Sequence, residues 1–209
     1  MMNTNELISI LSQTPPPKAP CRITVLAGGI LLLSALFTFV LLGVRPELQG
    51  GHVPLSFWMK SVLLTLNVLV CIQELDRVSR PQPRAQQPWL WRLLVSFVFI
   101  CLGIEWLTVD ASTILHGFLL PNFPECLVAV SVYGSAGLLG MNWLLKFYAP
   151  ADTRQCASVA GLTAAAAGAV GYSIHCPLDS PTFIVVAYGI PILILGWVGR
   201  RFLTKKIAW

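Results

Sequence analysis

The stretch ITVLAGGILLLSALFTFVLLGV, which occupies residues 23–44, contains no charged side chain. The hydrocarbon layer of a bilayer is about 30 Å thick, and about 20 apolar helical residues cross it. The stretch therefore predicts a membrane-spanning helix. The whole chain has the same character, because 56% of its 209 residues are hydrophobic, 11% are charged and its mean hydropathy is +0.73. Such a chain has too few polar residues to cover a water-soluble domain.

Charge-free runs of similar length recur along the chain. Three follow one another in its second half, and two others reach spanning length only when Lys60 and Glu105 are accepted inside them. The sequence thus predicts an all-α fold, a polytopic membrane bundle of six transmembrane helices. The expected limits of these helices are about 23–44, 55–74, 91–109, 126–146, 156–175 and 180–199.

The basic residues indicate how the bundle is oriented. A cytoplasmic N-terminus leaves only Arg45 and Lys60 on or toward the outer side, and places all other basic residues in the cytoplasm. The positive-inside rule therefore predicts that both termini are cytoplasmic. The chain divides into a cytoplasmic N-terminal head (1–22), a transmembrane domain (23–199) and a basic cytoplasmic tail (200–209).

Four apolar residues lie close together in the head, namely Leu7, Ile8, Ile10 and Leu11. A short amphipathic helix of this kind is marginal in water and orders when it binds a hydrophobic groove. The head is therefore a candidate partner-binding element. A flexible leader and a helix lying on the membrane surface are the alternatives.

Lys60 and Glu105 are the two charged residues inside predicted spans, each about five residues from the outer end of its helix. Their equal depth predicts an intramembrane ion pair that joins the second and third helices. A second structural reading is that both side chains extend outward to the membrane surface. The functional alternative is a relay for protons or ions, as in a small transporter or channel, because intramembrane charges often mark such pathways.

Six cysteines are distributed along the chain, and two of them fall at outer helix ends. Cys126 opens the fourth predicted span and Cys176 follows the fifth, so antiparallel packing would bring them together. His175, Glu125 and His116 would then be nearby. The group predicts either a redox pair or a metal site that uses Cys126, Cys176 and His175. The alternative is that both cysteines are inert small hydrophobic residues.

The chain contains none of the sequence motifs of the common soluble enzymes. A P-loop, GxSxG, HExxH, CxxC and a GxGxxG that opens a helix are all absent. We therefore expect that the protein is not an enzyme. A membrane thiol-redox protein remains an alternative, although the missing CxxC disfavours it.

Several segments of the second half resemble a known family. They are Ala149-Pro150, AGLTA at 160–164, GYSIHCPLDS at 171–180, Tyr188 and GRRFL at 199–203. Together they resemble the NrsF family of bacterial six-helix membrane proteins, which act as anti-sigma factors. The most specific part is the Tyr-x-x-His-Cys-Pro block within 171–180.

The resemblance implies a function. The protein would sit in the bacterial inner membrane, sequester a cytoplasmic extracytoplasmic-function sigma factor, and make no direct contact with nucleic acid. Two outward-facing cysteines of the family respond to heavy-metal or oxidative stress, and by position they correspond to Cys126 and Cys176. No resident cofactor is implied, although a divalent heavy-metal ion such as zinc or cadmium is a possible signal.

Overall fold

The computed structural model describes residues 22–45, 54–81, 88–119 and 122–207, and all regular elements in these ranges are helices. Six helices are long and apolar enough to cross a membrane, as the sequence predicted. They are α2 (Ile23–Leu41), α4 (Leu55–Val78), α5 (Pro88–Thr108), α7 (Asn122–Leu145), α8 (Thr153–Ser173) and α9 (Pro181–Phe202). Two short helices, α6 (Ala111–Gly117) and α10 (Thr204–Ile207), complete the described chain.

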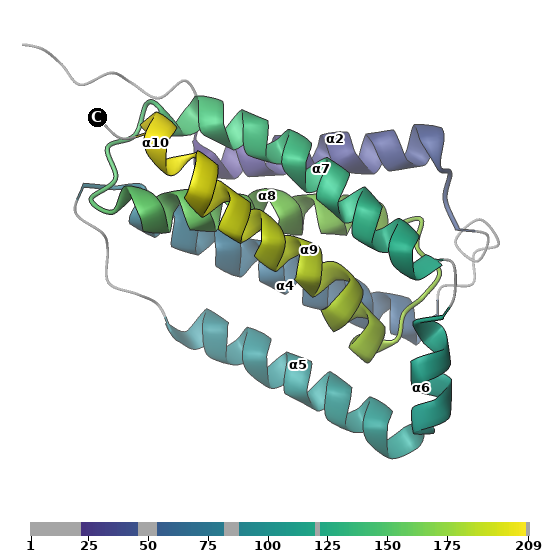
Figure 1. Ribbon diagram of the computed structural model, residues 1–209. Coiled ribbons are helices and arrows are strands. Elements are labelled where there is room, and N and C mark those ends of the chain that lie inside the picture. The colour runs from purple at the N-terminus through teal and green to yellow at the C-terminus, as the bar shows by residue number, and fades with distance from the viewer. Residues whose placement is uncertain (1–21, 46–53, 82–87, 120–121, 208–209) are drawn as a thin grey trace, which may run out of the picture.

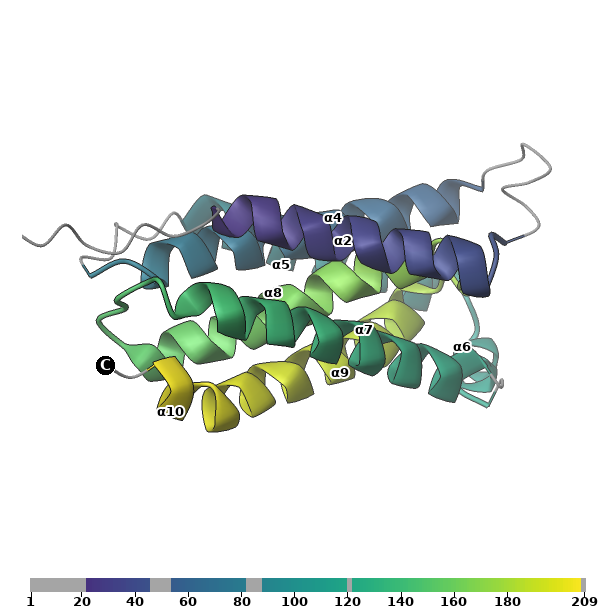
Figure 2. The same cartoon turned by 90° about the horizontal axis from the view of Figure 1, so that it is seen from above.

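Helix α8 is the centre of the bundle (Figures 1 and 2). It contacts α2, α4, α7 and α9, and most of its residues are buried. Small residues make this possible, because helices without large side chains at the interface can approach closely. At Gly161, an added Cβ would lie 2.1 Å from the backbone oxygen of Leu195 in α9. Close backbone approach at such residues is what allows α8 to pack against four other long helices.

Helix α5 stands apart from the other long helices (Figure 1). It packs against α4 and α9, and large apolar side chains such as Phe99 and Leu107 are exposed. Near its C-terminal end, the indole Nε1 of Trp106 donates to Thr182 Oγ1 at 3.1 Å. The exposed apolar side chains of this and the other long helices are typical of a surface that faces lipid rather than water.

The six long helices alternate in direction, so the bundle has two distinct ends (Figure 1). The thiol end carries Arg45, α6 and the loop 174–180, and both Cys126 and Cys176 lie there. The basic end is at the other side of the bundle. Its described basic residues are Arg22, Arg77, Arg80, Arg92, Lys146, Arg154, Arg200, Arg201, Lys205 and Lys206.

Local sequence signals explain where the central helices begin and end. Asp152 caps α8 by accepting hydrogen bonds from the backbone N–H groups of Arg154 and Gln155. Ser180 caps α9 in the same way, and Pro181 occupies the first turn, where no backbone donor is needed. Helix α4 continues beyond the predicted limit of 74 to Val78.

Candidate functional site: a buried thiol pair and its charged support

The structure brings Cys126 and Cys176 together at the thiol end. Cys126 lies in the first turns of α7, and Cys176 lies in the loop that follows α8. Their Sγ atoms are 3.2 Å apart, and neither side chain has exposed surface. Both thiols are free. Because a disulfide bond holds its sulfur atoms about 2 Å apart, the pair needs only a small further approach to close.

Two tyrosines flank the thiol pair. The Oη of Tyr172 lies 3.8 Å from Cys126 Sγ, and the buried hydroxyl of Tyr188 lies beside the thiol of Cys176. The hydrogen bond from Cys126 lowers the pKa of the Cys176 thiol, burial opposes this effect, and the nearby ammonium of Lys60 adds to the lowering. Since the thiolate is the reactive form of cysteine, these contacts favour reaction at Cys176.

The imidazole of His175 is engaged elsewhere. Its Nδ1 lies 3.1 Å from the backbone oxygen of Gly43, and its Nε2 lies 3.9 Å from Glu125 Oε1. His116 lies on α6 and lines a separate cavity. Within the described ranges, no three His, Cys, Asp or Glu side chains converge to hold a metal ion. Among the described residues, the structure thus brings together the two cysteines of the predicted site, while His175 faces Gly43 and Glu125.

The expected ion pair between Lys60 and Glu105 does not form, and that prediction was wrong. Lys60 pairs instead with Asp179 in the loop 174–180, with 2.6 Å between Nζ and Oδ1. The ammonium also donates to the backbone oxygens of Cys176 at 2.7 Å and Leu178 at 3.2 Å. The Lys60 side chain is completely buried, so these three acceptors replace its hydration.

Arg45 binds the same loop from the other side. Its guanidinium contacts both carboxylate oxygens of Asp179 at 2.9 to 3.1 Å, a bidentate arrangement that favours arginine over lysine. It also donates to the backbone oxygens of Cys176 at 3.5 Å and Pro177 at 3.4 Å. Burial raises the pKa of the Asp179 carboxyl, but hydrogen bonds from Arg45 and Lys60 outweigh burial and bring it below its ordinary value.

Glu105 holds the start of α9. Its Oε2 accepts hydrogen bonds from the backbone N–H of Thr182 at 2.7 Å and from its hydroxyl at 2.6 Å, and its Oε1 accepts one from Ser180. A carboxylate is favourable here because the N-terminus of a helix carries unpaired N–H groups and a partial positive charge. This explains why Glu105 is not paired with Lys60. Lys60 and Glu105 both bind the loop 174–180 or its junction with α9, which favours a structural role over a transport pathway.

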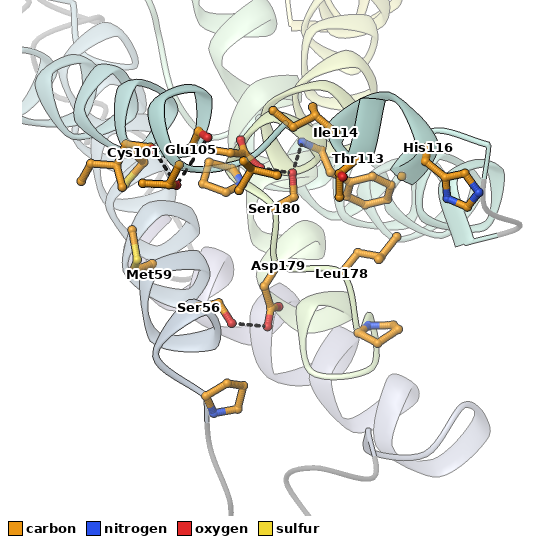
Figure 3. A pocket seen from close by; sticks show the side chains of 18 of the residues that line it. Ser56, Met59, Cys101, Glu105, Thr113, Ile114, His116, Leu178, Asp179 and Ser180 are labelled. Atoms are coloured by element: carbon orange, nitrogen blue, oxygen red, sulfur yellow. Dashed lines mark hydrogen bonds between the residues drawn. The ribbon is translucent and has the colours of Figure 1, made fainter. Parts of the chain in front are cut away.

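A cavity of about 800 Å³ opens between α4, α5, α6 and the loop 174–180 (Figure 3). Figure 3 shows Met59, Cys101 and Glu105 on one side of it, and Leu178, Asp179 and Ser180 on another. Ser56 donates to Asp179 across its floor at 3.1 Å. The residues that follow Cys176, from Pro177 to Ser180, line the cavity, but the two thiols of the pair do not.

Sequence reasoning missed Arg45 and Asp179 as members of this site. A signal was present, since Asp179 is the only charged residue between Arg154 and Arg200 and lies within the 171–180 block. A lone acid between two apolar runs needs a cation nearby. The predicted partner-binding residues of the head, Leu7, Ile8, Ile10 and Leu11, lie outside the described residues.

The fold and the site define a class of protein, namely an all-α bundle of six membrane-type helices with a buried thiol pair at one end. The chain matches the family model described as negative regulator of sigma F over residues 7–209, so it belongs to the NrsF family. Family membership confirms the resemblance found in the sequence and indicates a regulatory role.

Two relatives match the chain along nearly its whole length. One is the anti-sigma-F factor NrsF of Caulobacter vibrioides, 26% identical over 97% of this chain and 99% of that protein. The other is the probable anti-sigma-F factor NrsF of Azospira oryzae, 27% identical over 100% of both chains. No solved structure matches the chain significantly.

Proposed function

We propose that this protein is an anti-sigma factor of the bacterial inner membrane that sequesters an extracytoplasmic-function sigma factor in the cytoplasm. An oxidative signal outside the membrane would close the Cys126–Cys176 pair and release the partner. The observation that carries this proposal is the 3.2 Å separation of the two thiols at one end of a six-helix bundle. Membership of the NrsF family supports the partner class.

The proposed orientation places the thiol end outside and the basic end in the cytoplasm. The basic end carries ten of the described basic residues, whereas Arg45 and Lys60 lie at the thiol end and are held by Asp179. This asymmetry follows the positive-inside rule. It also places the thiols on the side where oxidising conditions permit disulfides to persist.

A disulfide at the thiol end would act on the partner through the packing of the bundle. Cys126 belongs to α7 and Cys176 follows α8, so a bond between them fixes the relative position of two helices that pack closely. The proposal requires that the bonded and free states differ in their packing at the basic end. The coupling is modest, because a tenfold change in affinity corresponds to about 1.4 kcal/mol.

A soft divalent metal such as zinc or cadmium is the second candidate signal. Two thiolates are suitable ligands, but stable sites of such metals usually have four. His175 would have to leave Gly43 and Glu125 to join them. A disulfide needs no such rearrangement, and we therefore place it first.

The sulfur chemistry and the partner are tested together in the native host. Membranes that contain the tagged full-length protein are solubilised, and bound proteins are identified before and after oxidation. We expect a sigma factor to be retained by the reduced protein and lost from the oxidised one. Recovery without any sigma factor in either state contradicts the proposal.

Cysteine variants identify the trigger. Cys126→Ser, Cys176→Ser and the double variant should lose oxidant-induced release to the same extent, because the two thiols act as one unit. Cys101→Ser is the matched control, since Cys101 is also buried but lies in α5. Normal induction by oxidants and by cadmium in both single variants, at normal abundance, would place the trigger elsewhere.

A further inference from the structure

The two thiols are positioned by different kinds of structure. Cys126 is part of a helix, so its backbone is fixed by α7. Cys176 comes after the end of α8, where its backbone N–H donates to Tyr172 O at 3.4 Å, and it lies in a loop outside any regular element. Beyond this one backbone bond, side chains around the loop hold Cys176 at contact distance from Cys126.

We propose that Lys60 is the positioning residue of the thiol pair: it binds the segment 176–179 and holds Cys176 against Cys126. This inference rests on the proposed disulfide trigger and adds a residue from α4 to it. Lys60 positions the thiol of Cys176 indirectly, through its hydrogen bond to the backbone oxygen of that residue.

The contacts of Lys60 are concentrated on this one segment. An ammonium group has three N–H donors, and its three acceptors here are Cys176 O, Leu178 O and Asp179 Oδ1. The shortest bond to a backbone atom, 2.7 Å, is the one to Cys176 itself. Arg45 has longer contacts to the backbone, at 3.4 and 3.5 Å, and mainly binds the Asp179 carboxylate.

Burial makes the arrangement rigid. Lys60 has no exposed surface and cannot exchange its partners for water, so moving the segment away would leave a buried ammonium without acceptors. Leaving a buried charge unpaired is strongly unfavourable. The segment and the ammonium therefore move together or not at all, and the Cys176 thiol stays where Cys126 can reach it.

The chemistry that depends on this placement is the second step of thiol oxidation. With hydrogen peroxide, the Cys176 thiolate attacks one peroxide oxygen, the O–O bond breaks, and protonation of the departing hydroxide gives water and a sulfenic acid. The Cys126 thiol then attacks the sulfenic sulfur, the S–S bond forms, the S–O bond breaks and a second water leaves. Two thiols lose two electrons and two protons to one peroxide. A misplaced pair would stop at the sulfenic acid, which persists or oxidises further.

The test measures, in the purified full-length protein, how much of the sulfenic acid becomes disulfide and how much is trapped before it can do so. The protein is treated with hydrogen peroxide in the presence of dimedone, which traps sulfenic acids. Mass spectrometry then quantifies the Cys126–Cys176 disulfide and the dimedone adducts on these two residues. The ratio is independent of how fast peroxide arrives, because both products come from the same intermediate.

Lys60→Met keeps the four-atom apolar body of the side chain but removes the terminal ammonium, and with it the donors and the charge. We expect the ratio of adduct to disulfide to rise at least tenfold. Thr163→Val is the matched control, since Thr163 is also completely buried but its hydroxyl donates to the backbone oxygens of Cys71 and Val159 instead of to the segment 176–179. Its ratio should stay within about twofold of the wild type. An unchanged ratio in Lys60→Met overturns the inference, as does an equal rise in both variants.

Lys60→Gln provides a second variant if Lys60→Met does not accumulate. Its uncharged amide is one atom shorter and cannot reach Cys176 O and Asp179 together, so the ratio should rise at least threefold, and an unchanged ratio again overturns the inference. Disulfide formation in the wild-type protein shows whether a failed test concerns the role of Lys60 or the proposed disulfide trigger on which that role rests. A wild-type protein that forms no disulfide removes the proposed trigger, whereas equal closure in the wild type and the Lys60 variants removes only the role of Lys60.

Discussion

The Asp179 carboxylate forms ion pairs with two buried cations: its Oδ1 lies 2.6 Å from Lys60 Nζ and 2.9 Å from Arg45 Nη1. One carboxylate thus joins the segment after α2, helix α4 and the loop that carries Cys176. Its removal would leave two buried positive charges without a counter-ion. This relationship leads to the first two predictions.

Asp179→Asn should lower the free energy of unfolding by about 3 to 5 kcal/mol, because breaking a buried ion pair leaves uncompensated charge. Asp76→Asn is the control, since Asp76 pairs with Arg80 at a partly exposed site, where solvent screening weakens such a pair to about 1 kcal/mol. Chemical denaturation in detergent measures both values. An equal loss in the two variants contradicts the assigned role of Asp179.

The same carboxylate predicts how stability depends on pH. Its pKa is lower in the folded protein than in the unfolded chain, so its contribution is complete above the unfolded pKa of about 4. The contribution is lost as the pH falls through the folded pKa. Unfolding curves between pH 6 and pH 3 should therefore show a decline in the wild type that is smaller in Asp179→Asn. Parallel curves would show that another group is responsible.

The close contact of Gly161 with α9 predicts that even a small side chain at this position destabilises the bundle. In Gly161→Ala the new Cβ would lie 2.1 Å from the backbone oxygen of Leu195, so α8 and α9 must move apart. We expect a loss of about 1 to 3 kcal/mol. Gly189→Ala is the control within α9, because nothing lies within 4 Å of its Cβ and alanine favours a helix over glycine. Thermal unfolding should rank the wild type between these two variants.

Reporter fusions test the orientation. Fusions after Gly50 and Leu120 should be active outside the cytoplasm, and fusions after Arg84 and Trp209 should be active inside it. The physical reason is the concentration of basic residues at one end of the bundle. Cytoplasmic activity of the fusion after Leu120 would contradict the proposed crossing of six helices.

Substitutions at Leu7 and Leu11 test whether the head binds the partner. Replacing both with Asp should remove the apolar face, weaken sigma-factor binding and raise transcription of the regulated genes. Membrane abundance should stay unchanged, which immunoblotting of the membrane fraction checks. Unaltered repression would show that the partner binds elsewhere.

Charge-free runs predicted four of the six helices, and runs that contain the single charges Lys60 and Glu105 predicted the other two, because spanning a bilayer imposes a length and a composition on each helix. The meeting of Cys126 and Cys176 also followed from simple reasoning, since consecutive antiparallel helices bring such helix ends together. The partner of Lys60 could not be predicted in this way. Its position in the sequence gives its depth but not the direction in which it points around the bundle.

The peripheral position of α5 was equally hidden, because a helix that faces lipid on most sides has the same composition as one that is half buried. Consequently Glu105 was expected at an interface with α4, whereas it binds the N-terminus of α9. The loop after α8 was read as a boundary between two spans. Its role as the shared partner of Arg45, Lys60 and Glu105 depends on three-dimensional proximity that no local pattern encodes.

The complete burial of Cys126 and Cys176 has a consequence for the signals that the protein can distinguish. A sulfur atom without exposed surface reacts only with molecules that pass through the surrounding side chains. Size and charge then determine the rate, beyond the redox potential of the reagent. Small neutral oxidants such as hydrogen peroxide should react much faster than bulky anionic disulfides such as oxidised glutathione, so the packing itself acts as a kinetic filter for the identity of the oxidant.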